Sequence, residues 1–380
     1  QAPHEWDFYF LFNKHHNHPC VTQNFRFDEQ ARIHVMLKIS LAEFNDEVFP
    51  ISYNFSLIFL TFILEIIFVC GYKKIKGILM VKKIQVSANG LKLSQLSHGL
   101  WRLRQWNLSK AELKNLIYKS IELGITTFDH ADIYGSFSCE EFFGEVLKEE
   151  PAMRNQIELV TKCDIVFPSP QRPQYRFHYY DTSKEHIIES VEQSLRNFGT
   201  DHIDLLLIHR PDPLMNADDT ADGLMSVVNS GKVLNIGVSN FLPFQFDLLQ
   251  SRLEIPLVTN QIEFSVVHLN PLYDGTLHQS QQLRISPMIW SPLAGGRLFT
   301  DNSEQAIRLR DELNRLTNIY NASIEQIALA WIFAHPSNPI VVVGSGKSER
   351  IAEYSKSVEI KLSREDWFRI LAASEGHEVP

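Results

Sequence analysis

The chain has 380 residues, of which 44% are hydrophobic and 21% charged, a composition typical of a globular protein with a large core. Its net charge of −9 argues against a nucleic-acid-binding protein, which would show a basic stripe. The four cysteines include no C-x-x-C pair, so they predict neither a metal site nor a disulfide framework, and they fit a reducing, cytoplasmic compartment.

Residues 1–79 differ from the rest of the chain, because they are crowded with Phe, Ile, Asn, Lys and Tyr. They contain a short apolar run at residues 56–70, which Glu65 interrupts, whereas a membrane span needs about 20 apolar residues. Three interpretations stay open: a membrane anchor, a packed extension, and translated sequence upstream of a true start at Met80. We expect residues 1–79 to be a non-domain extension and residues 80–380 to be the functional domain, with membrane attachment only if the extension is genuine.

From Met80 onward, short apolar runs alternate with amphipathic stretches, as expected for parallel strands that helices cover on the outside. This alternation predicts an α/β fold, a single (β/α)8 TIM barrel, whose usual size is about 250 residues. Before the barrel, the Asn-Gly pair at residues 89–90 predicts a β-hairpin that closes the barrel bottom. The expected strands are Leu96–Trp101, Gly124–Phe128, Ile157–Thr161, Ile203–Ile208, Val233–Val238, Val258–Ile262, Ile285–Trp290 and Ile340–Val343.

Helix starts are marked by capping boxes, in which Ser or Thr precedes Glu or Gln by three residues. Four segments have this form, at residues 109–112, 138–141, 182–185 and 323–326. The third should open a helix that buries a stripe of apolar side chains, namely Ile187, Val191, Leu195 and Phe198. Ser363–Ser374 predicts one extra C-terminal helix.

Four chemically suited side chains follow the ends of three predicted strands. Asp129 and Tyr134 lie five residues apart after one strand, and Lys162 and His209 each close another. A barrel enzyme carries its chemistry at that end of the strands. We expect Tyr134 to donate a proton to a carbonyl oxygen, with its pKa lowered from about 10 by the Lys162 ammonium. Asp129 would hold Lys162, and His209 would orient and polarise the carbonyl; each residue alone also has an ordinary structural explanation.

The segment after the last strand predicts an anion site. Gly344, Ser345 and Gly346 precede a helix whose first amides would be exposed, and glycine allows close backbone approach. Lys347 and Arg350 add positive charge that suits a 2′-phosphate and therefore NADP(H) rather than NAD(H). The glycine spacing fits neither a P-loop nor a Rossmann fingerprint, and a plain surface turn is the alternative.

Further residues at the same rim suit a nicotinamide ring. Ser239, Asn240 and Gln261 carry groups that bind a carboxamide, and Trp290 offers a flat face for stacking. The loop from Ser291 through Leu293 to Leu298 is flexible enough to surround a pyrophosphate. The substrate wall is expected to be aromatic and to accept apolar carbonyls, and its candidate residues are Trp101, Trp106, Tyr175–Tyr180 and those near Phe299.

On five stretches, residues 80–380 resemble the aldo-keto reductase superfamily, in particular its YdhF-like branch of bacterial oxidoreductases. The stretches are Gly124–Gly135, Asp204–Asp212, Gly231–Phe241, Trp290–Leu293 and Gly344–Arg350. The resemblance implies a TIM barrel that reduces aldehydes or ketones with NADPH by direct hydride transfer, using a tetrad of Tyr134, Lys162, Asp129 and His209.

The resemblance also implies individual cofactor contacts. It places Asn240 and Gln261 on the carboxamide, Trp290 under the ring, and Lys347 and Arg350 on the adenosine phosphate. Glu353 and Tyr354 fall where the family contacts adenine, although the family more often has Asn at the latter position. Residues 1–79 have no counterpart in the family.

Two other functions remain open at this stage. The first is a regulatory cofactor-binding protein without physiological turnover, like the β subunits of voltage-gated potassium channels. The second is a lyase that uses Lys162 as a Schiff-base nucleophile, since barrels host such chemistry. The sequence predicts a small-molecule carbonyl substrate and no nucleic-acid partner, but neither the particular carbonyl nor the oligomeric state.

Overall fold

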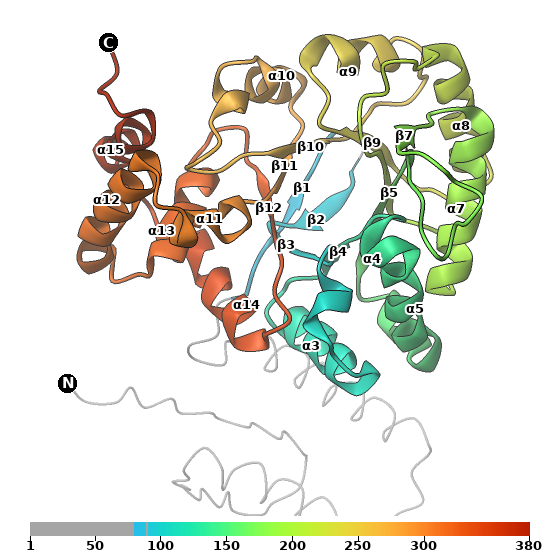
Figure 1. The fold of residues 1–380 in the computed structure, drawn as a ribbon, viewed down its shortest axis with the longest axis horizontal. Coiled ribbons are helices and arrows are strands. Elements are labelled where there is room, and N and C mark those ends of the chain that lie inside the picture. The colour runs from blue at the N-terminus through green and yellow to red at the C-terminus, as the bar shows by residue number, and fades with distance from the viewer. Residues whose placement is uncertain (1–79, 89) are drawn as a thin grey trace, which may run out of the picture. The chain divides into compact units, whose positions relative to one another are not determined.

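A computed structural model describes residues 80–88 and 90–380, which form a closed parallel barrel surrounded by helices (Figure 1). The strand order around the barrel is β10-β11-β12-β3-β4-β5-β8-β9, and the TIM-barrel prediction is confirmed. The strands are β3 (Leu96–Gly99), β4 (Thr127–Asp129), β5 (Glu158–Cys163), β8 (Leu205–Ile208), β9 (Ile236–Ser239), β10 (Asn260–Glu263), β11 (Met288–Trp290) and β12 (Ile340–Val343). The apolar run at residues 56–70 lies outside the described residues.

Each predicted strand corresponds to one observed strand, but most predicted runs begin too early. Ile203 and Val233, for example, form only an isolated parallel bridge before β8 and β9 begin. Apolar residues continue below the ladder because the lower end of the barrel is also buried, so hydrophobicity alone cannot mark where strand pairing starts. At the other end, Trp101 is not in β3; it lies in the following turn and is 56% exposed.

The predicted hairpin is present and closes the amino end of the barrel. Strands β1 (Lys83–Gln85) and β2 (Lys92–Ser94) pair antiparallel, and Gly90 adopts the positive φ that the turn requires. The amide of Ser94 donates to Thr127 Oγ1 (2.9 Å), and a backbone hydrogen bond joins Ser286 to Val86 (2.8 Å). These contacts are with the residues where β4 and β11 begin, so the opposite rim stays open.

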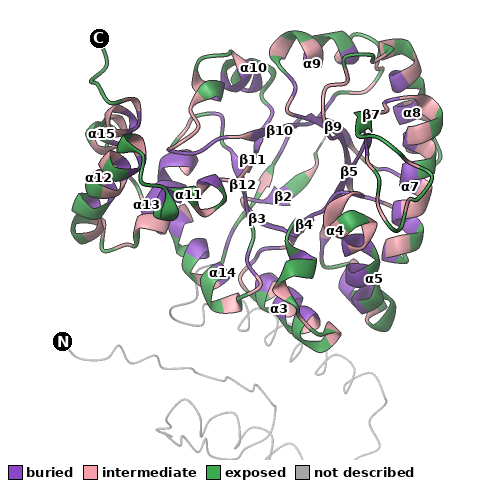
Figure 2. Ribbon diagram, viewed as in Figure 1, coloured by how far each residue is buried: buried purple, intermediate pink, exposed green. Residues whose placement is uncertain are grey.

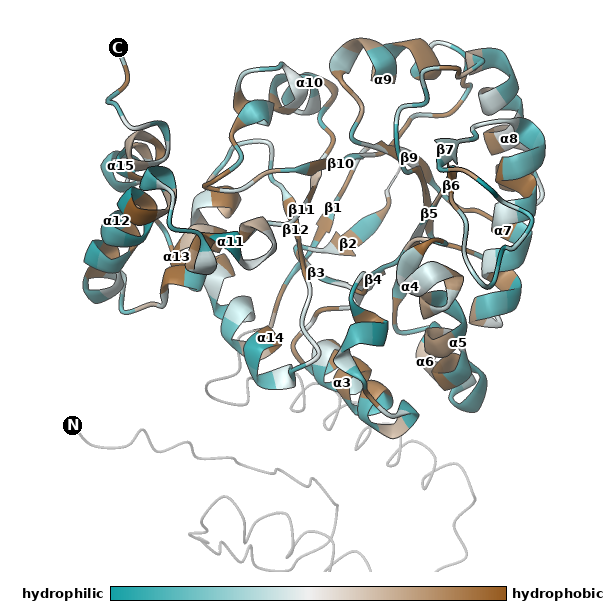
Figure 3. Ribbon diagram, in the orientation of Figure 1, coloured by the Kyte–Doolittle hydropathy of each residue, from teal (hydrophilic) through white to brown (hydrophobic). Residues whose placement is uncertain are grey.

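Helices cover the outside of the barrel, and burial is concentrated on the strands and on the inward helix faces (Figures 2 and 3). The four predicted stripe residues, Ile187, Val191, Leu195 and Phe198, are all buried. The main helices are α3 (Lys110–Glu122), α5 (Cys139–Glu149), α7 (Lys184–Phe198), α8 (Ala217–Asn229), α9 (Pro243–Gln250), α10 (Thr276–Leu283), α12 (Glu304–Tyr320), α13 (Ile324–Phe333), α14 (Ser348–Ser355) and α15 (Arg364–Glu375). Shorter turns are η1 (Leu103–Trp106), α4 (Tyr134–Phe137), α6 (Pro151–Arg154), η2 (Asn270–Leu272), η3 (Ala294–Gly296), α11 (Arg297–Thr300) and η4 (Lys356–Glu359).

Two of the four predicted capping boxes are confirmed, those opened by Ser109 and Ser323. The box at Thr182 is wrong by one residue, because Ser183 caps α7 while Thr182 donates to Asp212. The box at Ser138 is also wrong, since its hydroxyl donates back to the Gly135 carbonyl. In both cases a nearby turn offers the hydroxyl another partner, which the sequence pattern does not reveal.

The extra C-terminal helix is confirmed as α15, with Ile370 and Leu371 buried. Its Trp367 stacks on Trp331 of α13, with ring centroids 4.8 Å apart. Among the described residues, none of the helices is long and apolar enough to cross a bilayer. The long connection Cys163–Asp181 contains a small hairpin of β6 (Ile165–Val166) and β7 (Tyr179–Tyr180).

Candidate active site

The four predicted catalytic residues meet at the carboxyl end of the barrel strands. Asp129 ends β4, Lys162 lies near the end of β5, His209 follows β8, and Tyr134 opens α4. The Lys162 ammonium lies 2.9 Å from each carboxylate oxygen of Asp129 and 3.3 Å from the Tyr134 hydroxyl. The amine therefore bridges the acid and the phenol.

Strand register explains this convergence. Strands β4 and β5 are parallel, with Asp129 opposite Val160, so Lys162 lies two residues further along and on the same face. The amide of Asp132 then donates to the Lys162 carbonyl (3.1 Å), which turns the chain so that Tyr134 returns over the amine. Two short elements are thus enough to place three functional groups together.

The Lys162 ammonium is enclosed by acceptors. It is 1% exposed, and besides Asp129 and Tyr134 it donates to the His130 carbonyl (2.6 Å). Gln261 Nε2 donates to Asp129 Oδ1 from the other side (2.7 Å), which fixes the carboxylate. Burial alone would lower the pKa of Lys162, but the charge of Asp129 and the interactions with Asp129 and Tyr134 together outweigh it and raise that pKa.

The expectation that Lys162 leaves Tyr134 with a lowered pKa is wrong in its net direction. Burial raises the pKa of Tyr134 above 10 and outweighs the opposing effect of the Lys162 charge. The sequence indicated the charge that favours phenolate but not the extent of desolvation, which depends on everything packed around the ring. The phenol therefore stays protonated at neutral pH.

His209 lies edge-on to Tyr134, with ring centroids 6.0 Å apart. Burial, followed by the charges of Lys162 and Arg210, holds the pKa of His209 well below its usual range, so the imidazole is neutral. Its backbone amide donates to Cys163 (3.0 Å), which ties the end of β8 to the end of β5. Its Nδ1 is buried and has no hydrogen-bond partner in the part of the chain that the structure describes.

The tetrad opens into a cavity of about 750 Å³, within the usual range for a ligand site. The cavity extends from Asp129, Tyr134 and His209 to Arg350 and Tyr354 of α14. Its wall also contains the predicted cofactor residues Ser239, Asn240, Gln261, Trp290, Ser291, Leu293 and Gly344. Its size and its span from the tetrad to Arg350 of α14 fit an extended dinucleotide.

Several of these predicted cofactor residues also form hydrogen bonds with one another. The indole of Trp290 donates to Asn240 Oδ1 (2.9 Å), and the Asn240 amide donates to Ser239 Oγ (2.8 Å) and to the His209 carbonyl (3.2 Å). Asn240 adopts φ 63°, a left-handed conformation that Asn tolerates better than most residues. This network fixes the plane of Trp290 relative to the tetrad.

Four predicted cofactor residues do not line the cavity: Ser345, Gly346, Lys347 and Glu353. A Cβ on Gly346 would lie 2.7 Å from Trp106 Cγ, so this glycine accommodates an indole. The Ser345 carbonyl bonds to His98, and Lys347 is an exposed N-cap of α14. The Glu353 carboxylate accepts a hydrogen bond from Gln326 and forms an ion pair with Lys356.

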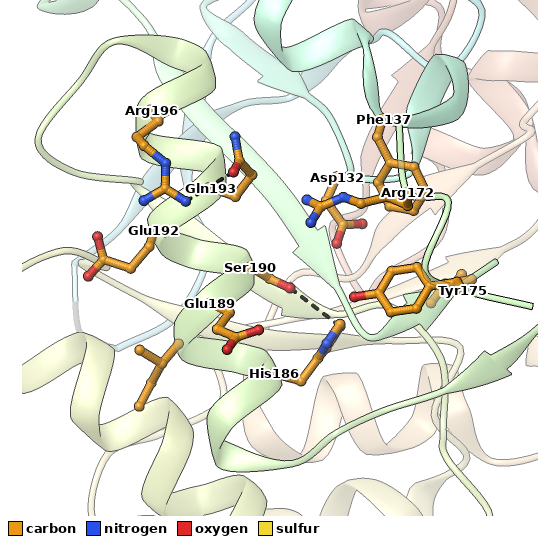
Figure 4. Close-up of a pocket in the computed structure, with 12 residues that line it drawn as sticks. Asp132, Phe137, Arg172, Tyr175, His186, Glu189, Ser190, Glu192, Gln193 and Arg196 are labelled. Carbon is orange, nitrogen blue, oxygen red and sulfur yellow. Dashed lines mark hydrogen bonds between the residues drawn. The ribbon is translucent and has the colours of Figure 1, made fainter. Parts of the chain in front are cut away.

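The substrate wall agrees only in part with the expectation. Trp101, Trp106 and Phe299 line the cavity, together with Ile133 and Ile165. The segment Tyr175–Tyr180 does not; Tyr175 instead lines a separate cavity of about 340 Å³ with Asp132, Arg172 and His186 (Figure 4). The β6–β7 hairpin causes this difference, because it carries the aromatic segment over α7.

The cavity wall also contains two arginines that were not predicted, Arg102 and Arg210. Arg210 directly follows His209, and that adjacency was the signal that could have identified it. The two arginines make the cavity wall more polar than predicted.

Comparison with known proteins identifies the family. The family model described as "Aldo/keto reductase family" matches residues 95–375. The chain is 50% identical to the uncharacterized oxidoreductase YcsN of Bacillus subtilis over 301 residues, which are 79% of this chain and 100% of YcsN. It is 50% identical to the oxidoreductase YdhF of Escherichia coli, over 79% of this chain and all of YdhF.

Two further relatives are informative. A 6-dehydroglucose reductase of Agrobacterium fabrum is 42% identical, over 76% of this chain and 97% of that protein. The crystal structure of a thermostable aldo-keto reductase in complex with the inhibitor epalrestat has 26% identity and a TM-score of 0.64, and the match covers 77% of this chain and 99% of that one. The chain therefore belongs to the aldo/keto reductase family and is an NAD(P)H-dependent oxidoreductase.

Proposed function

We propose that this protein reduces an aldehyde or ketone to an alcohol with NADPH, using Tyr134 as the general acid. The observation that carries the proposal is the contact of one buried ammonium, Lys162, with both Asp129 and the Tyr134 hydroxyl at the end of a large cavity. Such an arrangement suits delivery of a proton to a carbonyl oxygen.

NADPH, when bound, supplies a hydride to the carbonyl carbon, and the carbonyl oxygen takes a proton from Tyr134. The raised pKa of Tyr134 keeps its proton in place until the oxygen begins to acquire alkoxide character. An alkoxide is far more basic than a phenolate, so the transfer is then favourable. The Lys162 ammonium stabilises the phenolate that forms, and Asp129 keeps the ammonium aligned.

His209 acts as a neutral group in this proposal. Because its pKa is well below the usual range, it does not supply the transferred proton at neutral pH. Its buried edge-on position beside Tyr134 suits a hydrogen bond that orients the substrate carbonyl. Tyr134 and His209 would then contact the same oxygen.

The cavity wall supports a full set of cofactor contacts. Ser239, Asn240 and Gln261 would face the carboxamide, and Trp290 would stack on the ring. The segment containing Ser291 and Leu293 would surround the pyrophosphate. Toward the other end, Arg350 lies on the wall beside Tyr354, and its charge favours the additional phosphate of NADPH. Lys347, the exposed N-cap of the same helix, would add to that charge.

The alternative lyase function is disfavoured by the surroundings of Lys162. A Schiff-base nucleophile must be a neutral amine, usually with a lowered pKa. Here the pKa of Lys162 is raised, and its ammonium donates to Asp129, His130 and Tyr134. The alternative of a regulatory cofactor-binding protein keeps the same geometry, so only turnover separates it from a reductase.

The test measures NADPH oxidation in the presence of a panel of carbonyl compounds. The loss of the near-ultraviolet absorbance of NADPH reports the reaction. The panel should include 6-dehydroglucose, because one relative is a reductase of that sugar. We expect turnover that the Tyr134→Phe variant loses while it still binds NADPH. Binding of NADPH without turnover of any carbonyl would favour the regulatory alternative.

We also propose that residues 80–380 contain the whole catalytic unit and that residues 1–79 lie outside it. The family match begins at residue 95, and the relatives YcsN and YdhF are covered completely by about 300 residues of this chain. The mass of the mature protein would show whether residues 1–79 are retained. The cytoplasmic location inferred from cysteine usage stays a prediction.

A further inference from the structure

Arg210 is a half-buried cation that has no acidic partner among the described residues. Its guanidinium carbon lies 5.7 Å from the centroid of the Trp290 ring. Within residues 80–88 and 90–380, no carboxylate lies within ion-pairing distance of it and no side-chain hydrogen bond satisfies its five N–H donors. The guanidinium of Arg210 is therefore available to bind a ligand in the cavity.

The neighbouring acids do not compensate this charge. Asp164 Oδ2 accepts the backbone amide of Arg210 (2.9 Å), which fixes the main chain but leaves the guanidinium unpaired. Burial raises the pKa of Asp164 well above its usual range, which favours the neutral form of this carboxyl. Asp212 accepts hydrogen bonds from Thr182 and from the amide of Leu214.

The charges on the cavity wall are unbalanced at the tetrad end. The wall carries two acids, and Asp129 is already paired with Lys162. The other, Glu325, acts on Tyr354 at the adenosine end. Arg102 donates to the Gly295 carbonyl in the loop after β11, whereas the charge of Arg210 acts on both Tyr134 and His209. Arg210 is therefore an unbalanced positive charge near the tetrad, although the whole chain carries a net charge of −9. An anion bound there would find complementary charge.

The cofactor phosphates are not the natural partner of Arg210. This residue directly follows His209 and contacts Trp290, both of which belong to the tetrad and ring end of the cavity. The predicted phosphate contacts are elsewhere, at Arg350 and at the loop after β11. The remaining ligand at this end is the substrate.

We infer that the substrate is a carbonyl compound that carries a carboxylate, and that Arg210 binds this carboxylate. Arginine binds carboxylates through two parallel N–H···O bonds, which also orients the ligand. A neutral polyol fits less well, because it carries no negative charge to complement the guanidinium of Arg210. The inference rests on the proposed reductase function and names its substrate class.

The experiment compares matched anionic and neutral substrates. The probes are succinic semialdehyde against butanal, and 4-formylbenzoate against its methyl ester. The variants are Arg210→Met, which removes the charge, and Arg210→Lys, which keeps the charge without the planar fork. The control is Arg364→Met, because Arg364 makes the same kind of contact with Phe368 on the exposed helix α15.

We expect wild-type kcat/KM to favour the anionic member of each pair. Arg210→Met should reduce that preference by roughly 10- to 100-fold, mainly through KM, as expected for a lost charged hydrogen bond. Arg210→Lys should keep part of the preference, and Arg364→Met should keep all of it. Equal kcat/KM values within both wild-type pairs, or an unchanged preference in Arg210→Met, would overturn the inference.

A binding measurement separates this inference from the proposed function. Calorimetry would follow 4-formylbenzoate binding to the NADP⁺ complex, where no reduction can occur. If Arg210→Met weakens this binding but not NADPH binding, the inference holds even if no carbonyl is turned over. If Arg210→Met instead weakens NADPH binding to the same extent, Arg210 serves the cofactor and the inference is wrong.

Discussion

Replacement of Tyr134 by Phe removes one oxygen from the site and little else. Among residues 80–88 and 90–380, the hydroxyl makes one side-chain hydrogen bond, to Lys162 at 3.3 Å. Lys162 keeps both oxygens of Asp129 and the carbonyl of His130 after the change. We therefore expect Tyr134→Phe to lower the free energy of unfolding by no more than about 1 kcal/mol, the usual net value of one hydrogen bond.

The effect on catalysis should be much larger than the effect on folding. Proton delivery by a positioned acid accelerates a reaction by about 10²–10⁴-fold. At about 1.36 kcal/mol for each tenfold change, the loss corresponds to about 3–5 kcal/mol of activation free energy. This separation between the two free energies distinguishes a general acid from a residue that only supports the fold.

The assay is kcat/KM for one carbonyl substrate, measured together with NADPH affinity and the denaturant midpoint. Tyr118→Phe is a matched control, because Tyr118 is similarly half-buried and its hydroxyl contacts Glu150 outside the site. Unchanged NADPH affinity and a normal midpoint are expected for both variants. A loss of less than about tenfold in kcat/KM for Tyr134→Phe would refute the assignment of the acid.

Three further outcomes are expected. Lys162→Met should lower the free energy of unfolding by about 3–5 kcal/mol, because it leaves the Asp129 carboxylate buried without a counter-charge. A denaturant unfolding curve that matches wild type would contradict a stabilising buried ion pair. Burial lowers the pKa of His98 from 6.5 to about 4, so below pH 6.5 the unfolded chain binds a proton that the folded chain does not. Stability should therefore fall by about 3 kcal/mol between pH 6.5 and pH 4, and thermal melts should show a weaker decline for His98→Gln. Arg350→Ala should reduce affinity for NADPH far more than for NADH in fluorescence titrations, and equal losses would count against recognition of the 2′-phosphate.

The architecture was predictable because it depends on a repeated local pattern. Parallel strands buried on both faces must be short apolar runs, and the helices between them must carry one apolar stripe, as in Ile187 and Val191. The strand starts were less predictable, because residues such as Ile203 are buried below the ladder without joining it. Caps failed where a neighbouring turn supplied a better partner, as for Ser138.

Most residues of the candidate site could also be predicted from the sequence. Asp129, Lys162 and His209 come at the ends of their strands, and parallel strands in a closed barrel bring those ends to one rim. The register between β4 and β5 then places Lys162 against Asp129. No knowledge of distant packing was needed for that conclusion.

The barrel, its open rim and the residue types found there could be read from periodicity along the chain. The balance of charge and solvation at the rim could not, because it depends on the packed three-dimensional fold. This fold raised the pKa of Tyr134 where the charge of Lys162 had suggested the reverse, and within the described part of the chain it left Arg210 without an acidic partner. The reason is physical: desolvation and charge pairing depend on every atom packed around a group, and those atoms come from segments far apart in the sequence.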